Sequence, residues 1–224
     1  MTVRIAVVST VTLLILLPCV ATKAAFDEWA IGLKTGTLGI GGELTTDILP
    51  QLNLRGSVQW FGLDLDDIDI GDVSYDLDLT LLNPMLLVDW YPFGGALRLS
   101  GGVLFNQSDV ELRARPSEPV EIGDIIYTPG EIGTLTGEAD FDEIAPYVGI
   151  GFGNAVSEDS RWGLTADLGV AFIGSPGVTL RASGPIAGNA EFQSQLAEEE
   201  KDIEDDLENF EFYPVLAVNL YYHF

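Results

Sequence analysis

The side chains that could do chemistry in this sequence are few. It has one histidine, His223, and one cysteine, Cys19. Few residues are therefore available to build a metal centre or a catalytic nucleophile with its base. Carboxylates are the exception, because 35 Asp and Glu stand against 10 Lys and Arg, a formal charge of −25. Such a chain repels phosphate backbones, which proteins bind through clustered Lys and Arg. We therefore expect no nucleic-acid partner, no catalytic residue, no bound metal and no cofactor.

The densest group of carboxylates lies between positions 64 and 78. Its aspartates invite a calcium interpretation, because calcium loops place oxygen ligands at alternate positions before a glycine. Here the adjacent Asp66 and Asp67 break that register. We interpret the segment as a solvated loop. The alternative is that magnesium or calcium ions bridge its carboxylates to other anionic molecules. Its members are Asp64, Asp66, Asp67, Asp69, Asp72, Asp76 and Asp78.

The N-terminus predicts export. Residues 5–20 form an apolar run behind a basic residue, and small residues at the positions a signal peptidase reads follow it. The run is interrupted by hydroxyl side chains and a proline and is short for a transmembrane anchor, which needs about 20 residues. We predict a signal peptide over residues 1–24, cleaved after Ala24 or Ala25. The mature domain, residues 25–224, then has no cysteine and keeps 8 basic and 35 acidic residues, a formal charge of −27.

The body of the chain alternates with a period of two. Apolar and polar residues alternate along residues 51–62, and the same alternation occurs in residues 97–106, 162–172 and 216–224. This is the pattern of strands with one apolar and one polar face. After the signal no run of 18 apolar residues remains, which excludes a helical membrane protein.

Aromatic residues mark the ends of these alternating segments. Trp162 opens one segment and Phe172 lies ten residues later, while Phe212 precedes Tyr222 by a similar interval. About ten residues of a tilted strand rise roughly 25 Å, the height of the apolar band between the aromatic girdles of an outer-membrane barrel. We assign to these girdles Trp29, Trp60, Trp90, Tyr91, Phe93, Trp162, Phe172 and Tyr222.

Connection lengths divide the chain into strands. Short connections at 47–51, 91–96 and 154–161 alternate with longer ones, as short periplasmic turns alternate with long outer loops in such barrels. Seven strands result, and Trp29–Lys34, joined through a tight turn at 35–37, supplies an eighth. The prediction is an all-β, eight-stranded antiparallel transmembrane β-barrel, with strands at 29–34, 37–47, 51–63, 74–90, 96–113, 135–153, 161–183 and 212–224.

One long connection predicts a helix. Between Asn189 and Phe210, apolar residues recur at spacings of 3, 4 and 7, which places them on one helix face among many acidic residues. We expect a helix in the last outer loop. Its stripe either packs on the barrel mouth as a lid or rim, or offers a surface to a partner. The stripe consists of Phe192, Leu196, Ile203, Leu207 and Phe210.

Several charged residues are predicted to face the barrel interior. In a narrow lumen opposite charges should pair, because an unpaired buried charge costs several kcal/mol. We predict that they form a structural plug, and a gated or narrow pore is the alternative. These residues are Glu43, Arg55, Asp78, Asp89, Arg98 and Asp167.

The C-terminal sequence Leu220-Tyr221-Tyr222-His223-Phe224 resembles the C-terminal signature of bacterial outer-membrane β-barrels, with an aromatic residue last and apolar residues two and four before it. Residues 26–224 as a whole resemble the small eight-stranded barrels of the OmpA and OmpX kind, in particular a broad proteobacterial group. The stretches that carry this second likeness are Gly36-Thr37-Leu38-Gly39, Asp89-Trp90-Tyr91-Pro92-Phe93-Gly94-Gly95 and Gly174-Ser175-Pro176.

The resemblance implies the outer membrane of a Gram-negative bacterium, with insertion by the barrel assembly machinery. That machinery would read Leu220, Tyr222 and Phe224 as an assembly signal. We expect a monomer in contact with outer-membrane lipid and lipopolysaccharide, the latter through divalent cations. Barrels of this size have no fixed activity, so we predict a structural or surface-interaction role.

Two other functions are weighed against this role. The first is a narrow pore for small solutes. The second is a lipid-modifying enzyme like the outer-membrane lipid A deacylases and acyltransferases, which need a histidine near a serine. His223, the sole histidine, would lie at the periplasmic end, whereas the acyl substrates of deacylases lie in the outer leaflet. We therefore predict that the protein is not an enzyme.

Overall fold

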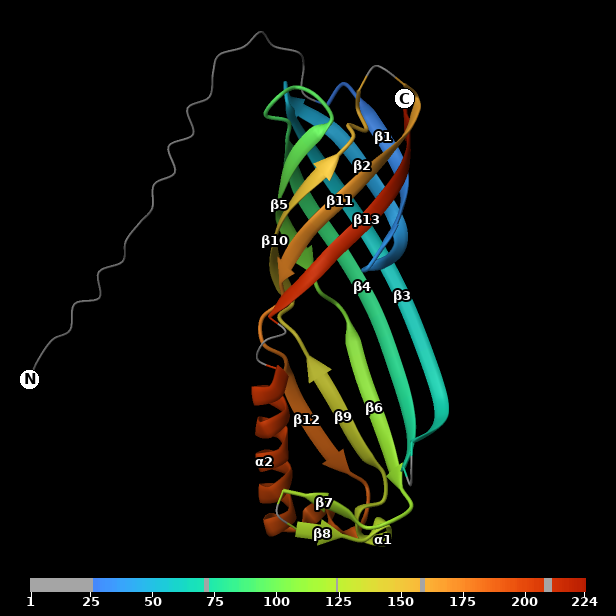
Figure 1. Ribbon diagram of the computed structural model, residues 1–224, viewed down its shortest axis with the longest axis vertical. Helices are drawn as coiled ribbons and strands as arrows, with labels where there is room; N and C mark the ends of the chain where they lie inside the picture. The colour runs from blue at the N-terminus through green and yellow to red at the C-terminus, as the bar shows by residue number, and fades with distance from the viewer. Residues whose placement is uncertain (1–25, 71–72, 124, 158–159, 208–210) are drawn as a thin grey trace, which may run out of the picture.

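The computed structural model describes residues 26–70, 73–123, 125–157, 160–207 and 211–224 (Figure 1). The predicted signal peptide lies outside these ranges. The described part contains thirteen strands rather than the eight predicted, together with the helices α1 and α2 and a short 3-10 helix, η1. No helix in it is long and apolar enough to cross a membrane.

Eight strands pair side by side in a closed antiparallel circuit. The order is β1–β2–β3–β4–β5–β10–β11–β13, and β13 pairs back with β1. Each of these strands is hydrogen-bonded on both sides, so the circuit exposes no strand edge. The bounds are β1 (Trp29–Gly36), β2 (Gly39–Leu49), β3 (Leu52–Ile70), β4 (Val73–Trp90), β5 (Leu97–Phe105), β10 (Ile144–Phe152), β11 (Trp162–Phe172) and β13 (Phe212–His223).

The long strands β3 and β4 continue past the circuit into a second sheet. β4 pairs with β5 over Met85–Trp90, but with β6 over Val73–Thr80. This distal sheet has the order β3–β4–β6–β9–β12, and Figure 1 shows it below the circuit. Its further strands are β6 (Asp109–Pro116), β9 (Leu135–Asp140) and β12 (Gly177–Ala182).

The distal sheet corrects four of the predicted elements. The predicted strands 96–113, 135–153 and 161–183 are each two strands, because the chain changes neighbours where it passes from the circuit to the distal sheet. Residues 64–70 and 73–78 of the acidic segment, expected to be a solvated loop, belong instead to the paired strands β3 and β4, and Asp72 lies outside the described residues. Leucines alternate with its aspartates, and that alternation suits a strand with one apolar face.

The first hairpin is shifted from its predicted position. β1 extends to Gly36 and β2 begins at Gly39, so the turn lies at Thr37 and Leu38 rather than at 35–37. Gly39 has φ +105°, a backbone conformation that glycine adopts readily and other residues rarely do. The glycine at this position therefore fixes where the second strand can start.

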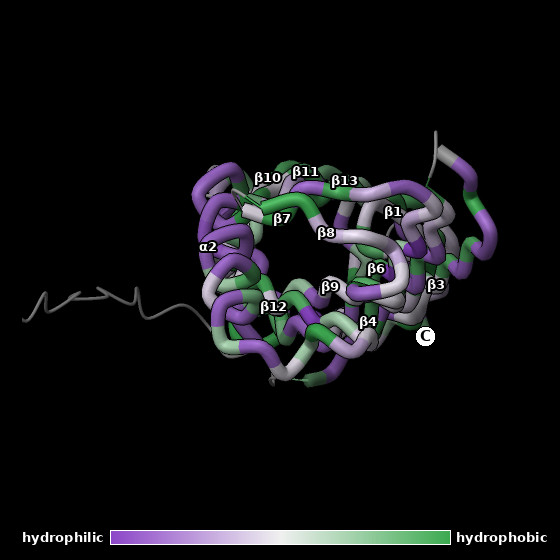
Figure 2. Tube along the Cα trace, turned by 90° about the horizontal axis from the view of Figure 1, so that it is seen from below, coloured by the Kyte–Doolittle hydropathy of each residue, from purple (hydrophilic) through white to green (hydrophobic). Residues whose placement is uncertain are grey.

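The far end of the distal sheet has a small core of its own. It holds β7 (Val120–Ile122), β8 (Ile125–Tyr127), α1 (Pro129–Ile132) and η1 (Pro185–Gly188), with α2 (Ala190–Leu207) running beside β12. Viewed from this end, β7 and β8 lie on the side opposite β9 and β12, and α2 lies along one side (Figure 2). The buried side chains of this core are Ile122, Tyr127, Ile132, Phe192 and Leu196.

The predicted helix therefore forms, but it is not a lid on the circuit. Its Phe192 and Leu196 pack in the distal core because the connection from β12 starts at the far end of the distal sheet. Phe210, the last residue of the predicted stripe, lies outside the described residues.

Helix α2 also covers the free edge of β12. The backbone N–H of Leu180 donates to Glu200 Oε1 at 2.6 Å, and that of Val178 donates to Glu204 Oε1 at 2.9 Å. Four residues of helix rise about 6 Å and two residues of strand about 6.6 Å, so glutamates at this spacing meet alternate backbone donors. The edge is thereby closed to pairing with another strand.

Candidate functional site

Six charged side chains fill one section of the space inside the circuit. Three are cations and three are carboxylates, so their charges cancel, and each residue is 5% exposed or less. They come from six different strands of the circuit. We call this group the ion-pair cluster; its members are Lys34, Glu43, Arg55, Asp89, Arg98 and Asp167.

Arg55 holds the centre of the ion-pair cluster. Its Nη1 lies 2.7 Å from Asp167 Oδ2 and 3.3 Å from Glu43 Oε2, and its Nε lies 2.9 Å from Asp89 Oδ2. Its Nη2 donates to Ser100 Oγ at 3.2 Å. One guanidinium thus bridges three carboxylates from three strands, an arrangement that its planar set of donors favours.

The remaining cations complete the pairing. Arg98 Nη2 lies 2.7 Å from Asp167 Oδ1, while Lys34 Nζ lies 2.8 Å from Glu43 Oε2. Neutral groups add further bonds: Asn219 Nδ2 donates to Glu43 Oε1 at 2.9 Å, and Ser100 Oγ donates to Asp89 Oδ1 at 2.6 Å. Every carboxylate of the cluster therefore has at least one cation and one further partner, as buried charges require.

Glycines make room for these long side chains. Gly151 pairs with Arg98 across β10 and β5, and a Cβ at Gly151 would stand 2.5 Å from Arg98 Nε. Gly32 faces the amide of Asn219 in the same way. The glycines alternating along the strands are therefore the small positions that let the interior hold charged residues.

Five of the six predicted interior residues lie in the ion-pair cluster, and Asp78 does not. It is exposed on the distal part of β4. Positions 78 and 89 are an odd number of residues apart on the unbroken strand β4. Because successive side chains of a strand alternate, the two face opposite sides of the sheet. Sequence reasoning missed Lys34, although the alternation of Ala30, Gly32 and Lys34 in the first strand would have placed it inside.

An apolar layer covers the ion-pair cluster on the side of the distal sheet. It includes Met85, Leu87, Leu104 and Tyr147, all 4% exposed or less. Tyr147 fills the space beside Gly149 and Gly169, where no side chain competes with its ring. The interior of the circuit thus contains a charged layer followed by an apolar one.

The outside of the circuit is apolar. Side chains such as Leu33, Leu86, Leu164 and Leu220 are between 46% and 64% exposed and lie on the faces opposite the cluster. A soluble protein rarely exposes apolar residues so regularly, but a barrel surrounded by lipid must.

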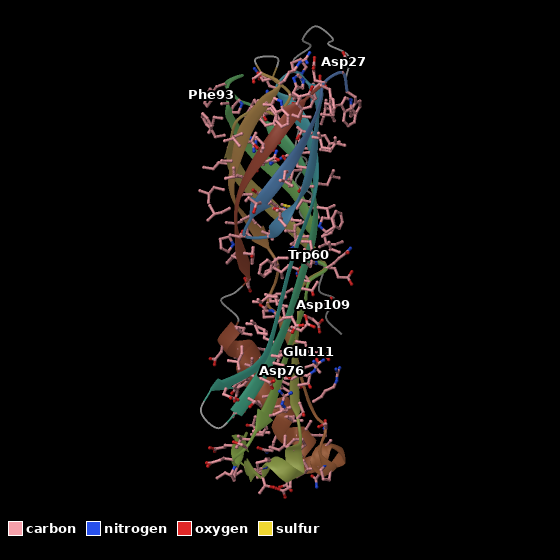
Figure 3. All side chains as sticks on the ribbon, turned by 90° about the vertical axis from the view of Figure 1, so that its right-hand side faces the viewer. Asp27, Trp60, Asp76, Phe93, Asp109 and Glu111 are labelled. Atoms are coloured by element: carbon pink, nitrogen blue, oxygen red, sulfur yellow. The ribbon has the colours of Figure 1, made fainter. Side chains whose placement is uncertain are left out.

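Aromatic pairs mark both ends of this apolar surface. Trp162 and Tyr222 stack edge to face with centroids 5.0 Å apart at one end, and Phe172 and Phe212 do so at 5.4 Å at the other. Figure 3 shows Trp60 near the distal end of the circuit and Phe93 at the opposite end. Six of the eight predicted girdle residues are exposed and Tyr222 is half-buried: the exposed ones are Trp29, Trp60, Trp90, Phe93, Trp162 and Phe172.

Tyr91 is the exception among the predicted girdle residues. It is 3% exposed, and its hydroxyl donates to the carbonyl of Gly153 at 3.4 Å. Trp90 takes the outward position, and two adjacent residues at the end of a strand face opposite sides. The prediction for Tyr91 was therefore wrong.

Two aspartates of the acidic segment pair with an arginine. Arg115 Nη2 lies 2.8 Å from Asp76 Oδ1 and 3.0 Å from Asp67 Oδ1. The hydrogen bond from Arg115 lowers the pKa of Asp76, and the same bond raises the pKa of Arg115. Within the described ranges, no group of three or more His, Cys, Asp or Glu side chains is placed to hold a metal ion.

His223 lies at the end of the circuit that carries the chain terminus. Its Nε2 is 2.7 Å from Glu28 Oε2, and the side chain is buried. The imidazole thus ties the last strand to the residues before β1.

Comparison with known proteins gives a fold. No protein-family model matches the chain, and no curated protein matches it in sequence. Among solved structures, Acinetobacter baumannii CarO2 is similar with a TM-score of 0.59 and 21% identity, covering 90% of this chain and 100% of that one. Acinetobacter baumannii CarO gives a TM-score of 0.56 at 21% identity, covering 87% of this chain and 97% of that one.

The chain has the fold of the CarO proteins, which are outer-membrane β-barrels. This outcome supports the predicted all-β barrel class. The finer likeness to OmpA and OmpX stays a prediction.

Proposed function

We propose that this chain is an integral protein of a Gram-negative outer membrane, and that the eight-strand circuit is its transmembrane barrel. The apolar outer surface with aromatic pairs at both ends supports this location, since it matches the hydrocarbon band and its two interfaces. The fold shared with the CarO proteins supports it independently.

In this proposal the barrel is closed and its role is structural or surface-binding, not enzymatic. The observation that carries the proposal is the ion-pair cluster, in which Arg55 alone contacts three strands across the interior. A conducting lumen would need these side chains to leave one another, which is costly for buried charges. His223 is bonded to Glu28 at the terminal end of the barrel, away from the proposed outer side, which argues against lipid chemistry there.

The distal sheet is proposed to stand outside the cell, with the chain terminus on the periplasmic side. Its outward face carries Asp78, Asp109 and Glu111, and the labelled Asp76, Asp109 and Glu111 lie along this part of the molecule in Figure 3. Like-charged lipopolysaccharide could approach such a face only through bridging magnesium or calcium. We propose that contact, and a monomeric protein.

The barrel assembly machinery is the other proposed partner. Phe224 is 69% exposed beside Tyr222, with ring centroids 5.4 Å apart, and Leu220 lies on the same face. Deleting Phe224 should impair insertion in cells far more than it lowers the stability of barrel refolded in detergent. Equal defects in both assays would make Phe224 only a packing residue.

Planar-bilayer recording of the purified protein tests the closed barrel. The wild type should give no discrete conductance steps, and neither should the exposed variant Arg115→Ala. Discrete steps in the wild type, together with a changed ion selectivity of those steps in the Arg98→Ala variant, would instead establish the narrow pore. A shift in gel mobility on boiling shows that each sample contains the folded barrel.

A further inference from the structure

A cavity of about 260 Å³ lies where the circuit meets the distal sheet. Side chains of β4, β5, β6 and β13 form much of its wall, including Leu79, Leu81 and Leu104. The ion-pair cluster does not line it, and the apolar layer separates the two.

Asn83 is the most buried polar side chain in this apolar wall. Asn83 is 2% exposed and lines the cavity, and its amide makes no hydrogen bond within the described part of the chain. Directly across the sheet, Gln59 is fully buried and its Oε1 is also unbonded, while its Nε2 reaches only Met85 Sδ at 3.8 Å. A fully buried amide oxygen without a partner, as at Gln59, costs about 1–3 kcal/mol, and such groups are rare in native proteins.

The charge near the cavity restricts what could meet this amide. A neighbouring cavity of about 450 Å³ shares Asn106, Ser108 and Phe141 with the first. It is also lined by the carboxylates of Asp109, Asp140 and Glu143. An anionic head group entering beside these carboxylates would be repelled. Asn83 itself is neutral and offers both a donor and an acceptor, which suits a hydroxyl, carbonyl or amide.

The apolar wall continues along the inner face of the distal sheet. A further cavity of about 260 Å³ is lined by Tyr75, Leu112 and Leu180, which follow Leu79 on the same face of β4 and its neighbours. Leu65 and Leu112 are 37% and 41% exposed there, so this face is apolar yet incompletely covered. Exposed apolar grooves of this kind mark ligand-binding sites.

We propose that the cavity at Asn83 binds a small, mostly apolar molecule with one neutral hydrogen-bonding group. The hydroxyl of a medium-chain alcohol would bond to the Asn83 amide, and its chain would lie toward the inner face of the distal sheet. This site is independent of whether the barrel conducts, because the ion-pair cluster lies on the other side of the apolar layer.

Titration of the purified protein in lipid nanodiscs with 1-heptanol tests the proposal, followed by the methyl NMR shifts of Leu104. The shifts should saturate in the wild type. Asn83→Leu should bind about tenfold more weakly, as expected for one lost hydrogen bond. Leu79→Trp should abolish binding by filling the cavity, whereas the matched Leu86→Trp, outward-facing on the same strand, should bind normally.

Heptanoate and 1-aminoheptane test the choice of head group. Heptanoate should bind at least tenfold more weakly than the alcohol. Equal binding of heptanoate, or tighter binding of the amine, would overturn the neutral-head assignment. Unsaturable shifts, or equal binding in Leu79→Trp and the wild type, would show mere partition into the lipid and remove the site. A gel-mobility shift on boiling confirms that each variant is folded.

Discussion

Strands β3 and β4 pass through two parts of the molecule, and their alternation has opposite polarity in the two. In the circuit, β4 turns Asp89 inward and Leu86 outward. In the distal sheet, the same strand turns Leu79 inward and Asp76 and Asp78 outward. The period of two is continuous, yet the apolar face changes sides.

The difference shows that surroundings, not the strand itself, decide which face is apolar. Around the proposed transmembrane barrel the medium is hydrocarbon, so the outside is apolar and satisfied charges can occupy the interior. Around the distal sheet the medium is water, so carboxylates face out and leucines face in. The change falls near Trp60 on β3 and between Thr80 and Leu82 on β4, which marks the expected membrane boundary.

The interior charges should give the largest effect. Arg55→Met leaves three buried carboxylates short of a cation and should lower the free energy of unfolding by about 3–5 kcal/mol. The matched Arg115→Met removes an exposed arginine from two aspartates of the distal sheet and should change stability little. Urea unfolding of refolded protein in detergent compares them. Equal losses in the free energy of unfolding would mean that the buried arginine stabilises the protein no more than the exposed one.

The stability cost of an outward-facing arginine should also differ between the circuit and the distal sheet, by a smaller amount. Leu86→Arg places a charge on the proposed lipid-facing side and should cost about 2–4 kcal/mol, as charged residues do near the midplane of barrels. Thr80→Arg changes the same strand and face beyond the boundary and should stay within about 0.5 kcal/mol. Unfolding of the two variants in lipid vesicles gives the measurement, and a costly Thr80→Arg would move the boundary.

The edge of the distal sheet offers a local test. Glu200→Gln should weaken the bond to the Leu180 N–H and raise its hydrogen-exchange rate, with a local cost of about 1–2 kcal/mol. Exchange in the circuit should not change. Glu198→Gln on the same helix is the control, and faster exchange at Leu180 in that variant would remove the role given to Glu200.

The smallest expected effect is on the pKa of Asp76 in the distal sheet. Arg115 lowers the pKa of Asp76, so this pairing contributes fully at neutral pH and is lost only as the pH falls through the lowered pKa. Arg115→Gln should return the pKa of Asp76 toward its ordinary value. An NMR titration of the Asp76 carboxyl carbon checks the direction, and an unchanged pKa would show that Arg115 is not its cause.

Much of the barrel could be predicted from the sequence because period two and aromatic spacing are local signals. Arg55 and Arg98 were placed inside by their parity alone. Asp78 is predicted to face inward together with Asp89, but the two are 11 residues apart on the unbroken strand β4 and therefore face opposite sides. The distal sheet could not be predicted in this way, because alternation along one strand does not show which other strands are its neighbours. The cavity at Asn83 could not be predicted, since its walls come from strands and connections that lie far apart in the sequence.

Site-directed spin labelling along β4 in lipid nanodiscs tests the central claim most directly. Nitroxides at positions 86 and 88 should collide more with oxygen, which concentrates in hydrocarbon, and those at 76 and 78 more with a water-soluble nickel chelate. All four positions have outward-facing side chains on one continuous strand. A switch between Thr80 and Leu82 is the predicted result, and chelate access at 86 and 88 equal to that at 76 and 78 would contradict the account.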